Sequence, residues 1–354
     1  MASGYRRFLR LTAVLFCLLV FIISGSVCSA EGVTKTFRNV NQAVQYVKTE
    51  KPAELTLEDV KLTPSELLKV RKAMPEGAVL HFTTTWGGVV FTDEVVDLDL
   101  REIKGNVTGD DLEAVVALCP NLKSIDNSNK RSPSNNVMIP ICEKYPDIRF
   151  EWIVRLGKNH YCKTTQTAFS TFNEPFDDDM VTSYQLNKVM KYCYRLKALD
   201  LGHNALKDLE FVQYLPDLEF LIVGDNQIHD LTPISQLKHL QYLEIFSNYI
   251  TDLTPLAECT ELLDLNICYD PVYDFSPIDH LDSLERFWAT MIRHLPQEEM
   301  ERFQQVHPNV EVDFKGSHAT TNGWRKHPRY KHYIWCLRNN TWIPFNEPLP
   351  TETN

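Results

Sequence analysis

The fold is decided by the stretch that reads Leu196-Lys197-Ala198-Leu199-Asp200-Leu201-Gly202-His203-Asn204. Its pattern, L-x-x-L-x-L-x-x-N, returns every 22 residues and gives five copies in register, of which the fifth is the most degenerate. The copies begin at Leu196, Leu218, Leu240, Leu262 and Leu284. Their second halves repeat too, because residues 230–234 read Asp-Leu-Thr-Pro-Ile and residues 252–256 read Asp-Leu-Thr-Pro-Leu. Self-similarity at this period predicts a repeat architecture.

Each column of the repeat has a physical reason. The L-x-L core alternates with period two, which predicts a short strand with apolar residues on one face. Such a face is buried only when neighbouring units stack in parallel. The asparagine column holds Asn204, Asn226 and Asn248, with Asp270 in the fourth copy. We expect these side chains to satisfy backbone groups that would otherwise be buried without partners, and the Leu-Thr-Pro segments to form tight 3₁₀ turns.

These motifs resemble the internalin-like leucine-rich repeats of bacteria, which share the 22-residue unit and the convex turn. The chain as a whole resembles exported leucine-rich-repeat proteins of Gram-positive anaerobic bacteria. The shared marks are Leu156-Gly157-Lys158, the Ala198–Asn204 stretch and Gly323-Trp324-Arg325-Lys326-His327-Pro328-Arg329-Tyr330. Relatives tend to have Arg-Thr-Asp where this chain has Cys162-Lys163-Thr164-Thr165, so no role of that stretch carries over. The resemblance implies a fold and does not imply an activity.

The predicted fold class is therefore an α/β leucine-rich-repeat solenoid with a parallel concave sheet. Helix-backed units are expected in the N-terminal part and 22-residue units in the C-terminal part. The predicted segments are a signal peptide (1–30), degenerate helix-backed repeat units (31–153), an irregular insertion (154–195), five 22-residue repeats (196–295), and a C-terminal cap with a basic aromatic tail (296–354). A separate N-terminal α/β domain is the alternative.

The N-terminus predicts export. Arg6, Arg7 and Arg10 precede an apolar run of 13 residues, 11–23, and small residues follow up to Ala30. This order is typical of a cleaved secretory signal. We expect a secreted or surface protein that has no membrane insertion after cleavage. Removal of three arginines leaves 33 basic residues against 47 acidic ones, a net charge of −14, which argues against nucleic acid as a partner.

The sequence carries no catalytic signature, and we expect no cofactor and no metal. His160 and Cys162 could form a base and a nucleophile, but no family signature surrounds them. His318, His327 and His332 do not have the spacing of a zinc site. The seven cysteines that follow the signal are odd in number and irregular in spacing, so most are interpreted as small buried residues. The basic aromatic tail is expected to fold back onto the acidic repeats.

The concave face is the predicted binding surface. Residues that flank the inward leucines point away from the core, and four of them are aromatic at positions that the fold does not require. The predicted binding residues are Phe220, Ile222, Tyr242, Glu244, Phe246 and Trp288. We expect the four aromatic side chains to form a solvent-facing patch, unless the insertion or the tail covers it. Glu244 and Asp200 would favour a ligand that has a cationic group or sugar hydroxyls.

The predicted function is a non-enzymatic binding scaffold that presents this sheet to a protein, a peptide or a glycan outside the cell. The first alternative is an extracellular enzyme with a site built from the 154–195 insertion and the tail. It requires His160 and Cys162, or the tail histidines, to meet in one pocket. The second alternative is a self-associating component of the cell envelope.

Overall fold

The computed structural model describes residues 32–172 and 179–350, which divide into two compact units. The first unit comprises residues 1–96 and 110–122, and the second comprises residues 97–109 and 123–354. The predicted signal peptide lies outside the described residues. Within those residues, no helix combines the length and apolar character that a membrane span needs.

The first unit contains a four-stranded sheet with the order β1-β2-β3-β4. Three strands are parallel, and β3 and β4 form an antiparallel hairpin that the sequence reading did not anticipate. The strands are β1 (Val33–Lys35), β2 (Glu54–Val60), β3 (Val79–Trp86) and β4 (Val89–Thr92). The helices are α2 (Val40–Glu50), α3 (Pro64–Ala73) and most of α4 (Gly109–Leu118). Thr63 and Glu66 form a capping box at the start of α3.

The second unit begins with a small parallel sheet and a hairpin. The parallel strands are β5 (Asp97–Asp99), β6 (Ser124–Asp126) and β7 (Arg149–Glu151), and α5 (Asn135–Lys144) lies between β6 and β7 in the chain. The hairpin consists of β8 (Ile153–Leu156) and β9 (His160–Lys163). A hairpin thus lies at the start of the segment that was expected to be irregular.

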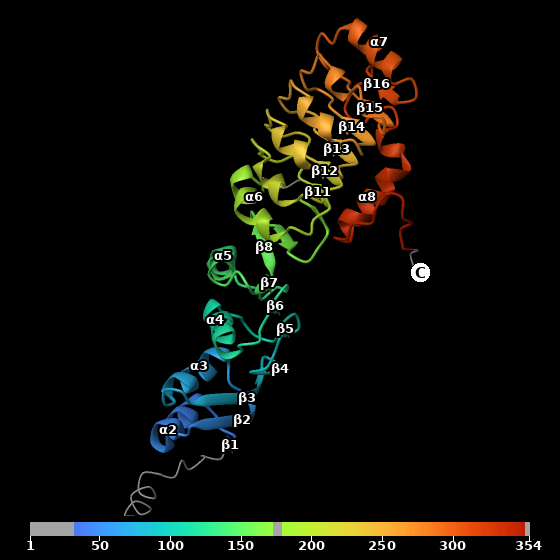
Figure 1. Cartoon of the computed structure of the whole chain (residues 1–354). Coiled ribbons are helices and arrows are strands. Elements are labelled where there is room, and N and C mark those ends of the chain that lie inside the picture. The colour runs from blue at the N-terminus through green and yellow to red at the C-terminus, as the bar shows by residue number, and fades with distance from the viewer. Residues whose placement is uncertain (1–31, 173–178, 351–354) are drawn as a thin grey trace, which may run out of the picture. The chain divides into compact units, whose positions relative to one another are not determined.

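A seven-stranded parallel sheet forms the body of the second unit, with the strands in chain order from β10 to β16 (Figure 1). The strands are β10 (Ala168–Ser170), β11 (Ala198–Asp200), β12 (Phe220–Ile222), β13 (Tyr242–Glu244), β14 (Asp264–Asn266), β15 (Arg286–Trp288) and β16 (Glu311–Asp313). The register advances by 22 residues from β11 to β15, as predicted. The insertion therefore supplies the strand next to the first repeat, and the C-terminal segment supplies the strand after the last.

Short 3₁₀ helices complete the convex side, and η3 and η4 among them lie at the Leu-Thr-Pro segments that were predicted to turn. They are η2 (Glu210–Tyr214), η3 (Thr232–Gln236), η4 (Thr254–Glu258) and η5 (Ser276–Ile278). The remaining elements are α6 (Ser183–Val189), η1 (Met190–Tyr192), α7 (Gln297–Val306), η6 (Trp324–Lys326) and α8 (Pro328–Arg338). The inward leucines Leu199, Leu221, Leu243 and Leu265 are fully buried between the sheet and this convex layer.

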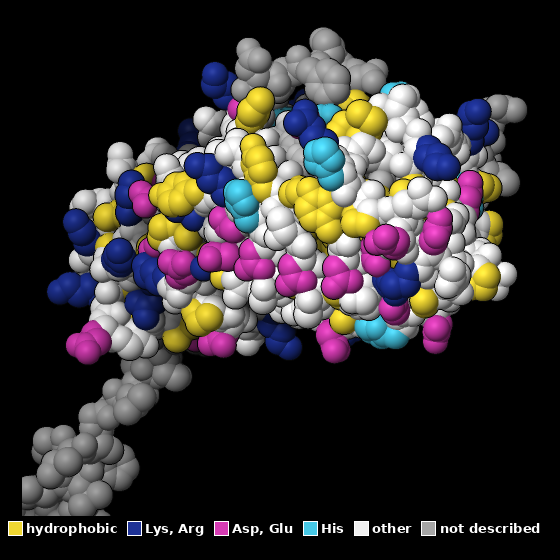
Figure 2. All heavy atoms as spheres, turned by 90° about the horizontal axis from the view of Figure 1, so that it is seen from above, with side chains coloured by type: hydrophobic (Ala, Val, Ile, Leu, Met, Phe, Trp, Pro, Cys, Tyr) yellow, Lys and Arg dark blue, Asp and Glu magenta, His cyan; other side chains and the backbone are white. Residues whose placement is uncertain are grey.

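The C-terminal helix α8 lies on the face of the sheet opposite the 3₁₀ helices (Figure 1). It contacts β10 and β11, the first two strands of the sheet. The surface of the molecule is acidic, since the chain carries a net charge of −11, and the face drawn in Figure 2 shows a row of Asp and Glu side chains. The basic C-terminal tail thus packs on the acidic repeats, as the distribution of charges along the sequence predicted.

Candidate functional site

The concave face is covered by the chain's own tail, so the prediction of a solvent-facing aromatic patch is wrong. Phe220 is 0% exposed, and Tyr242 and Trp288 are each 1% exposed. They pack with side chains from residues 319–342 into one hydrophobic cluster on the outer face of the sheet. Phe220 stacks on Tyr242 at 4.6 Å between ring centroids, and Tyr333 of α8 lies 4.6 Å from Phe220. Phe220, Tyr242 and Trp288 belong to the hydrophobic core because aromatic side chains of the tail pack against them.

Polar anchors fix the tail on the sheet. The Arg329 guanidinium contacts the fully buried Asp264 carboxylate at 2.6 and 2.9 Å and also contacts Glu285 at 2.7 Å. The indole N–H of Trp342 donates to Glu219 at 2.7 Å. Burial raises the pKa of Asp264, while Arg329 opposes this shift. The tail is therefore bound through specific charge pairs as well as through apolar packing.

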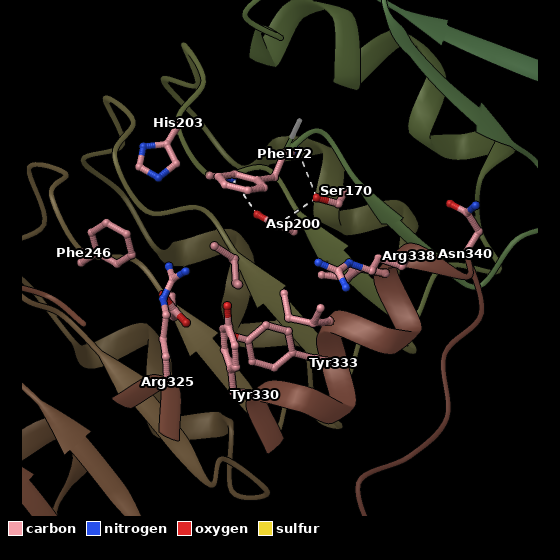
Figure 3. A pocket seen from close by; sticks show the side chains of 15 residues that line it. Ser170, Phe172, Asp200, His203, Phe246, Arg325, Tyr330, Tyr333, Arg338 and Asn340 are labelled. Carbon is pink, nitrogen blue, oxygen red and sulfur yellow. Dashed lines mark hydrogen bonds between the residues drawn. The ribbon is translucent and has the colours of Figure 1, made fainter. Parts of the chain in front are cut away.

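Between the tail and the sheet lies a cavity of about 460 Å³. The insertion, the repeats and the tail all contribute to it, as Figure 3 shows. Its lining is Ser170, Phe172, Asp200, Gly202, His203, Ile222, Glu244, Phe246, Arg325, Tyr330, Tyr333, Ile334, Leu337, Arg338 and Asn340. Three predicted binding residues are in this lining: Ile222, Glu244 and Phe246. The other three lie in the covered cluster.

Asp200 forms part of the sheet side of the cavity. Its carboxylate accepts hydrogen bonds from the Ser170 hydroxyl at 3.0 Å and from the Gly202 N–H at 3.1 Å. Burial raises the pKa of Asp200 to about 6, although these two hydrogen bonds act in the opposite direction, and nearby Glu244 adds to the rise. Asp200 thus places an acidic group at this end of the cavity.

Glu244 lies on β13, which is two strands away from β11 and Asp200. The Glu244 side chain is fully buried. Its Oε1 atom accepts hydrogen bonds from the Tyr242 hydroxyl and from the Trp324 indole N–H, the latter at 2.8 Å. Its Oε2 atom has no hydrogen-bond partner among the residues that the structure describes. A buried carboxylate oxygen without a partner is costly, so a built cavity next to it indicates a missing donor.

Glycines in the repeat make room for the cavity walls. Gly202 and Gly224 occupy the column in which the third copy has Phe246. A Cβ atom at Gly224 would lie 2.5 Å from the Phe246 ring, so that ring can lie over the backbone only because residue 224 has no side chain. Phe246 forms one aromatic wall, and Tyr330 and Tyr333 of α8 approach the same space (Figure 3).

The tail side of the cavity is positively charged. Arg325 reaches in from η6 and Arg338 from the end of α8 (Figure 3). The Arg325 guanidinium lies 5.6 Å from the Tyr330 ring centroid. Within residues 32–172 and 179–350, neither arginine has an ion pair within 4.0 Å. The cavity therefore has two acidic groups on the sheet and two basic groups on the tail.

The candidate catalytic pair does not form an active site. His160 and Cys162 both lie on the buried face of β9, where His160 Nε2 lies 3.1 Å from the Asp179 carbonyl oxygen. Burial and the neighbouring Cys193 raise the pKa of the Cys162 thiol well above its usual value. A thiol in this state is a poor nucleophile. Neither residue lines the cavity.

The tail histidines have separate structural roles. His327 caps α8 by accepting a hydrogen bond from the Arg329 N–H, and His332 Nε2 lies 2.8 Å from the Ile343 carbonyl oxygen. In the described part of the chain, no three His, Cys, Asp or Glu side chains are grouped so that they could hold a metal ion. The seven described cysteines are free, and six of them are buried.

Residues 216–258 match the family described as Leucine Rich repeats (2 copies), and they hold the second and third copies of the unit. The fold is a leucine-rich-repeat solenoid. No curated protein matches the chain. Among solved structures, the chain is similar to internalin C2 of Listeria monocytogenes, with 19% identity, 62% of this chain and 83% of that chain covered, and a TM-score of 0.31. It is also similar to a leucine-rich-repeat protein of Leptospira interrogans, with 19% identity, 73% and 71% coverage, and a TM-score of 0.35.

Sequence reasoning missed the cavity residues outside the repeats. Ser170 and Phe172 lie in the insertion, and Tyr330, Tyr333 and Arg338 lie on a helix that was not predicted. One signal was present in the sequence: the Gly-Trp-Arg stretch begins a basic aromatic tail, whereas the concave columns carry aromatic and acidic residues. Opposite charges and aromatic residues on the two segments indicate that the tail packs on the sheet. They do not indicate where a cavity remains between the two.

Proposed function

We propose that the protein is an exported, non-enzymatic binding scaffold that takes part of a protein, peptide or glycan partner into the cavity between the sheet and the tail. The observation that carries this proposal is the unpartnered Oε2 atom of fully buried Glu244 in the cavity wall. Several buried polar atoms of the described residues lack a hydrogen-bond partner, and among them Glu244 Oε2 is the one whose residue lines the cavity, so a ligand there can supply its missing donor. A volume of about 460 Å³ lies within the usual range for ligand sites, about 300–1,000 Å³.

A binding role rather than a catalytic one is supported by the state of the candidate nucleophile. The Cys162 thiol is buried, its pKa is raised, and it is not among the residues that line the cavity. The location proposed for the enzyme alternative is nevertheless where the cavity lies, since the insertion and the tail both line it. Three parts of this proposal are predictions from the sequence. The protein is exported, it acts outside the cell, and its net negative charge disfavours nucleic acid as a partner.

The proposal is tested by capturing partners from bacterial and host surface extracts on the immobilised mature protein. The double variant Phe172→Ala/Arg338→Ala removes two exposed lining side chains, so we expect it to lose partners that the wild type retains, at an unchanged melting temperature. The matched control is Arg293→Ala, an exposed arginine that does not line the cavity. Identical partners for the wild type and the double variant would refute a binding role of the cavity.

A further inference from the structure

The cavity has opposite charges on opposite walls. The sheet provides two carboxylates, Asp200 on β11 and Glu244 on β13, and the tail provides two guanidinium groups, Arg325 and Arg338. This separation follows from the fold, because the acidic side chains belong to the repeat columns and the basic ones to the segment that covers them. A ligand that carries both charges at its two ends would be oriented by such walls.

The carboxylates have unused capacity for a cation. Glu244 uses Oε1 for Tyr242 and Trp324, and its Oε2 atom is left without a hydrogen-bond partner among the described residues. Asp200 accepts hydrogen bonds from uncharged donors, Ser170 and the Gly202 backbone. A primary ammonium has three N–H donors in a compact head, and it would supply both a donor for Oε2 and a compensating charge.

The tail side of the cavity has unused capacity for an anion. Arg338 is exposed and has no ion pair within 4.0 Å among the residues that the structure describes. Arg325 has no ion pair within that distance either, but its guanidinium interacts with the charge of Glu244 and with Tyr330. Guanidinium groups bind carboxylates through paired N–H donors, which gives strong and directional hydrogen bonds. Between the charged walls, Phe246, Tyr330 and Tyr333 present ring surfaces that would pack against an apolar side chain.

We propose that the cavity binds a short free peptide, whose N-terminal ammonium lies at Asp200 and Glu244 and whose C-terminal carboxylate lies at Arg338. A side chain of the peptide, preferably aromatic or aliphatic, packs between the rings. This inference rests on the proposed binding function and specifies the chemical class of the ligand. It requires both charged ends in one molecule, which distinguishes a free peptide from an internal segment of a larger protein.

The test uses isothermal titration calorimetry on the mature chain with three probes: the dipeptide Leu-Phe, its N-acetylated form and its C-terminal amide. We expect Leu-Phe to bind most tightly and each capped form to bind about tenfold more weakly or worse, since each lacks one charge-assisted contact. Equal binding of the three forms would overturn the assignment of two charged ends. Binding of none of them would overturn the proposed ligand class.

Two variants assign the ends. Glu244→Gln should weaken Leu-Phe and the amide but leave the N-acetylated form unchanged, and Arg338→Gln should weaken Leu-Phe and the N-acetylated form but leave the amide unchanged. Arg293→Gln is the matched control for Arg338→Gln. Because Glu244 is buried, Asp200→Asn provides a second acidic variant with the same expected pattern should Glu244→Gln fail to fold. A pattern opposite to this one would overturn the proposed orientation.

The two proposals fail differently. If surface extracts yield partners that the Phe172→Ala/Arg338→Ala variant loses, while Leu-Phe does not bind, the binding scaffold stands and the short-peptide ligand is wrong. If neither partners nor Leu-Phe depend on the cavity residues, both proposals are wrong. Binding of Leu-Phe that requires both charged ends supports both.

Discussion

The asparagine column illustrates how single side chains hold successive repeats together. The Asn226 Nδ2 group donates to the carbonyl oxygens of Leu201, Val223 and Gly224, and its Oδ1 atom accepts from the Leu206 N–H at 2.9 Å. Two of these partners belong to the preceding repeat. The sequence predicted this structural role, because a polar residue at a fixed place in an apolar repeat needs backbone partners to be buried.

We predict that Asn226→Ala lowers the free energy of unfolding by about 1–3 kcal/mol, because it leaves buried backbone groups unpaired. Urea denaturation followed by circular dichroism measures the effect. Gln227→Ala, at the exposed neighbouring position, is the control and should unfold like the wild type. Equal midpoints for the Asn226→Ala variant and the wild type would show that the amide is dispensable.

Asp270 occupies the same column with an acid in place of the amide. Its Oδ1 atom accepts from the N–H groups of Asn248 and Ile250, but its Oδ2 atom has no partner among the described residues. Burial raises the pKa of Asp270 to about 8, and the two backbone hydrogen bonds oppose that shift. The folded protein therefore holds a proton here that the unfolded chain, with a pKa of about 4, has already lost at neutral pH.

The difference between the pKa of Asp270 in the folded and unfolded states determines how the free energy of unfolding changes with pH. Between about pH 4 and pH 8 the folded state binds more protons than the unfolded state at this residue, so its contribution to stability is complete at low pH and declines as the pH rises. The limiting slope is about 1.4 kcal/mol per pH unit. We predict that Asp270→Asn removes this decline and is more stable than the wild type at pH 8 by about 1–3 kcal/mol, because the amide restores a donor.

Denaturation at pH 5 and pH 8 checks the Asp270 prediction. Asp282→Asn, an exposed position in the same repeat, serves as the control for the loss of one acidic group. The prediction fails if Asp270→Asn and the wild type lose stability equally between the two pH values.

At the scale of elements, the repeat strands and turns were predicted and the covering helix was not. Residues 232–236 and 254–258 form the 3₁₀ turns that Leu-Thr-Pro indicated. Helix α8 is short, and its Tyr330, Tyr333, Ile334 and Leu337 have the i, i+3, i+4, i+7 spacing of one helix face, a signal that the sequence analysis did not use. Its stability as an element derives from packing on the concave face, which a single segment of sequence does not reveal.

Arg329 anchors this helix, and we predict that Arg329→Ala destabilises the fold by about 3 kcal/mol. The change leaves the fully buried Asp264 carboxylate without its closest cation, and a buried charge without a partner is costly. Thermal and urea unfolding measure the loss. Lys331→Ala, at an exposed position of the same helix, is the control. A wild-type stability for Arg329→Ala would mean that Arg286, 3.6 Å from Asp264, suffices as a partner.

At the scale of the whole molecule, the regular repeats gave a reliable prediction of the fold and a misleading prediction of the surface. The repeat columns place Phe220 and Tyr242 on adjacent strands, where the structure pairs them and stacks their rings. Whether such rings face solvent depends on segments elsewhere in the chain, here the tail with Tyr333 and Trp342. Position within a repeat determines which way a side chain points, and long-range packing determines what covers it.

The chain also carries an N-terminal segment whose fate affects the whole molecule. Residues 11–23 are apolar, and 13 residues would span only about 20 Å if helical, which is short for a hydrocarbon core of about 30 Å. Arginines before this run and small residues after it have the order of a cleaved export signal. We predict that the mature protein begins after Ala30 and is recovered outside the cell membrane.

N-terminal sequencing of the natural protein tests the export prediction. Cleavage removes three arginines and no acidic residue, so the mature chain should focus at a more acidic pH than the full chain. A variant with Arg6, Arg7 and Arg10 changed to Glu should accumulate unprocessed in the cell, because the positive n-region is lost. A sequence that starts at Met1 in the membrane fraction would contradict the prediction, and the segment would then act as an anchor instead of a signal.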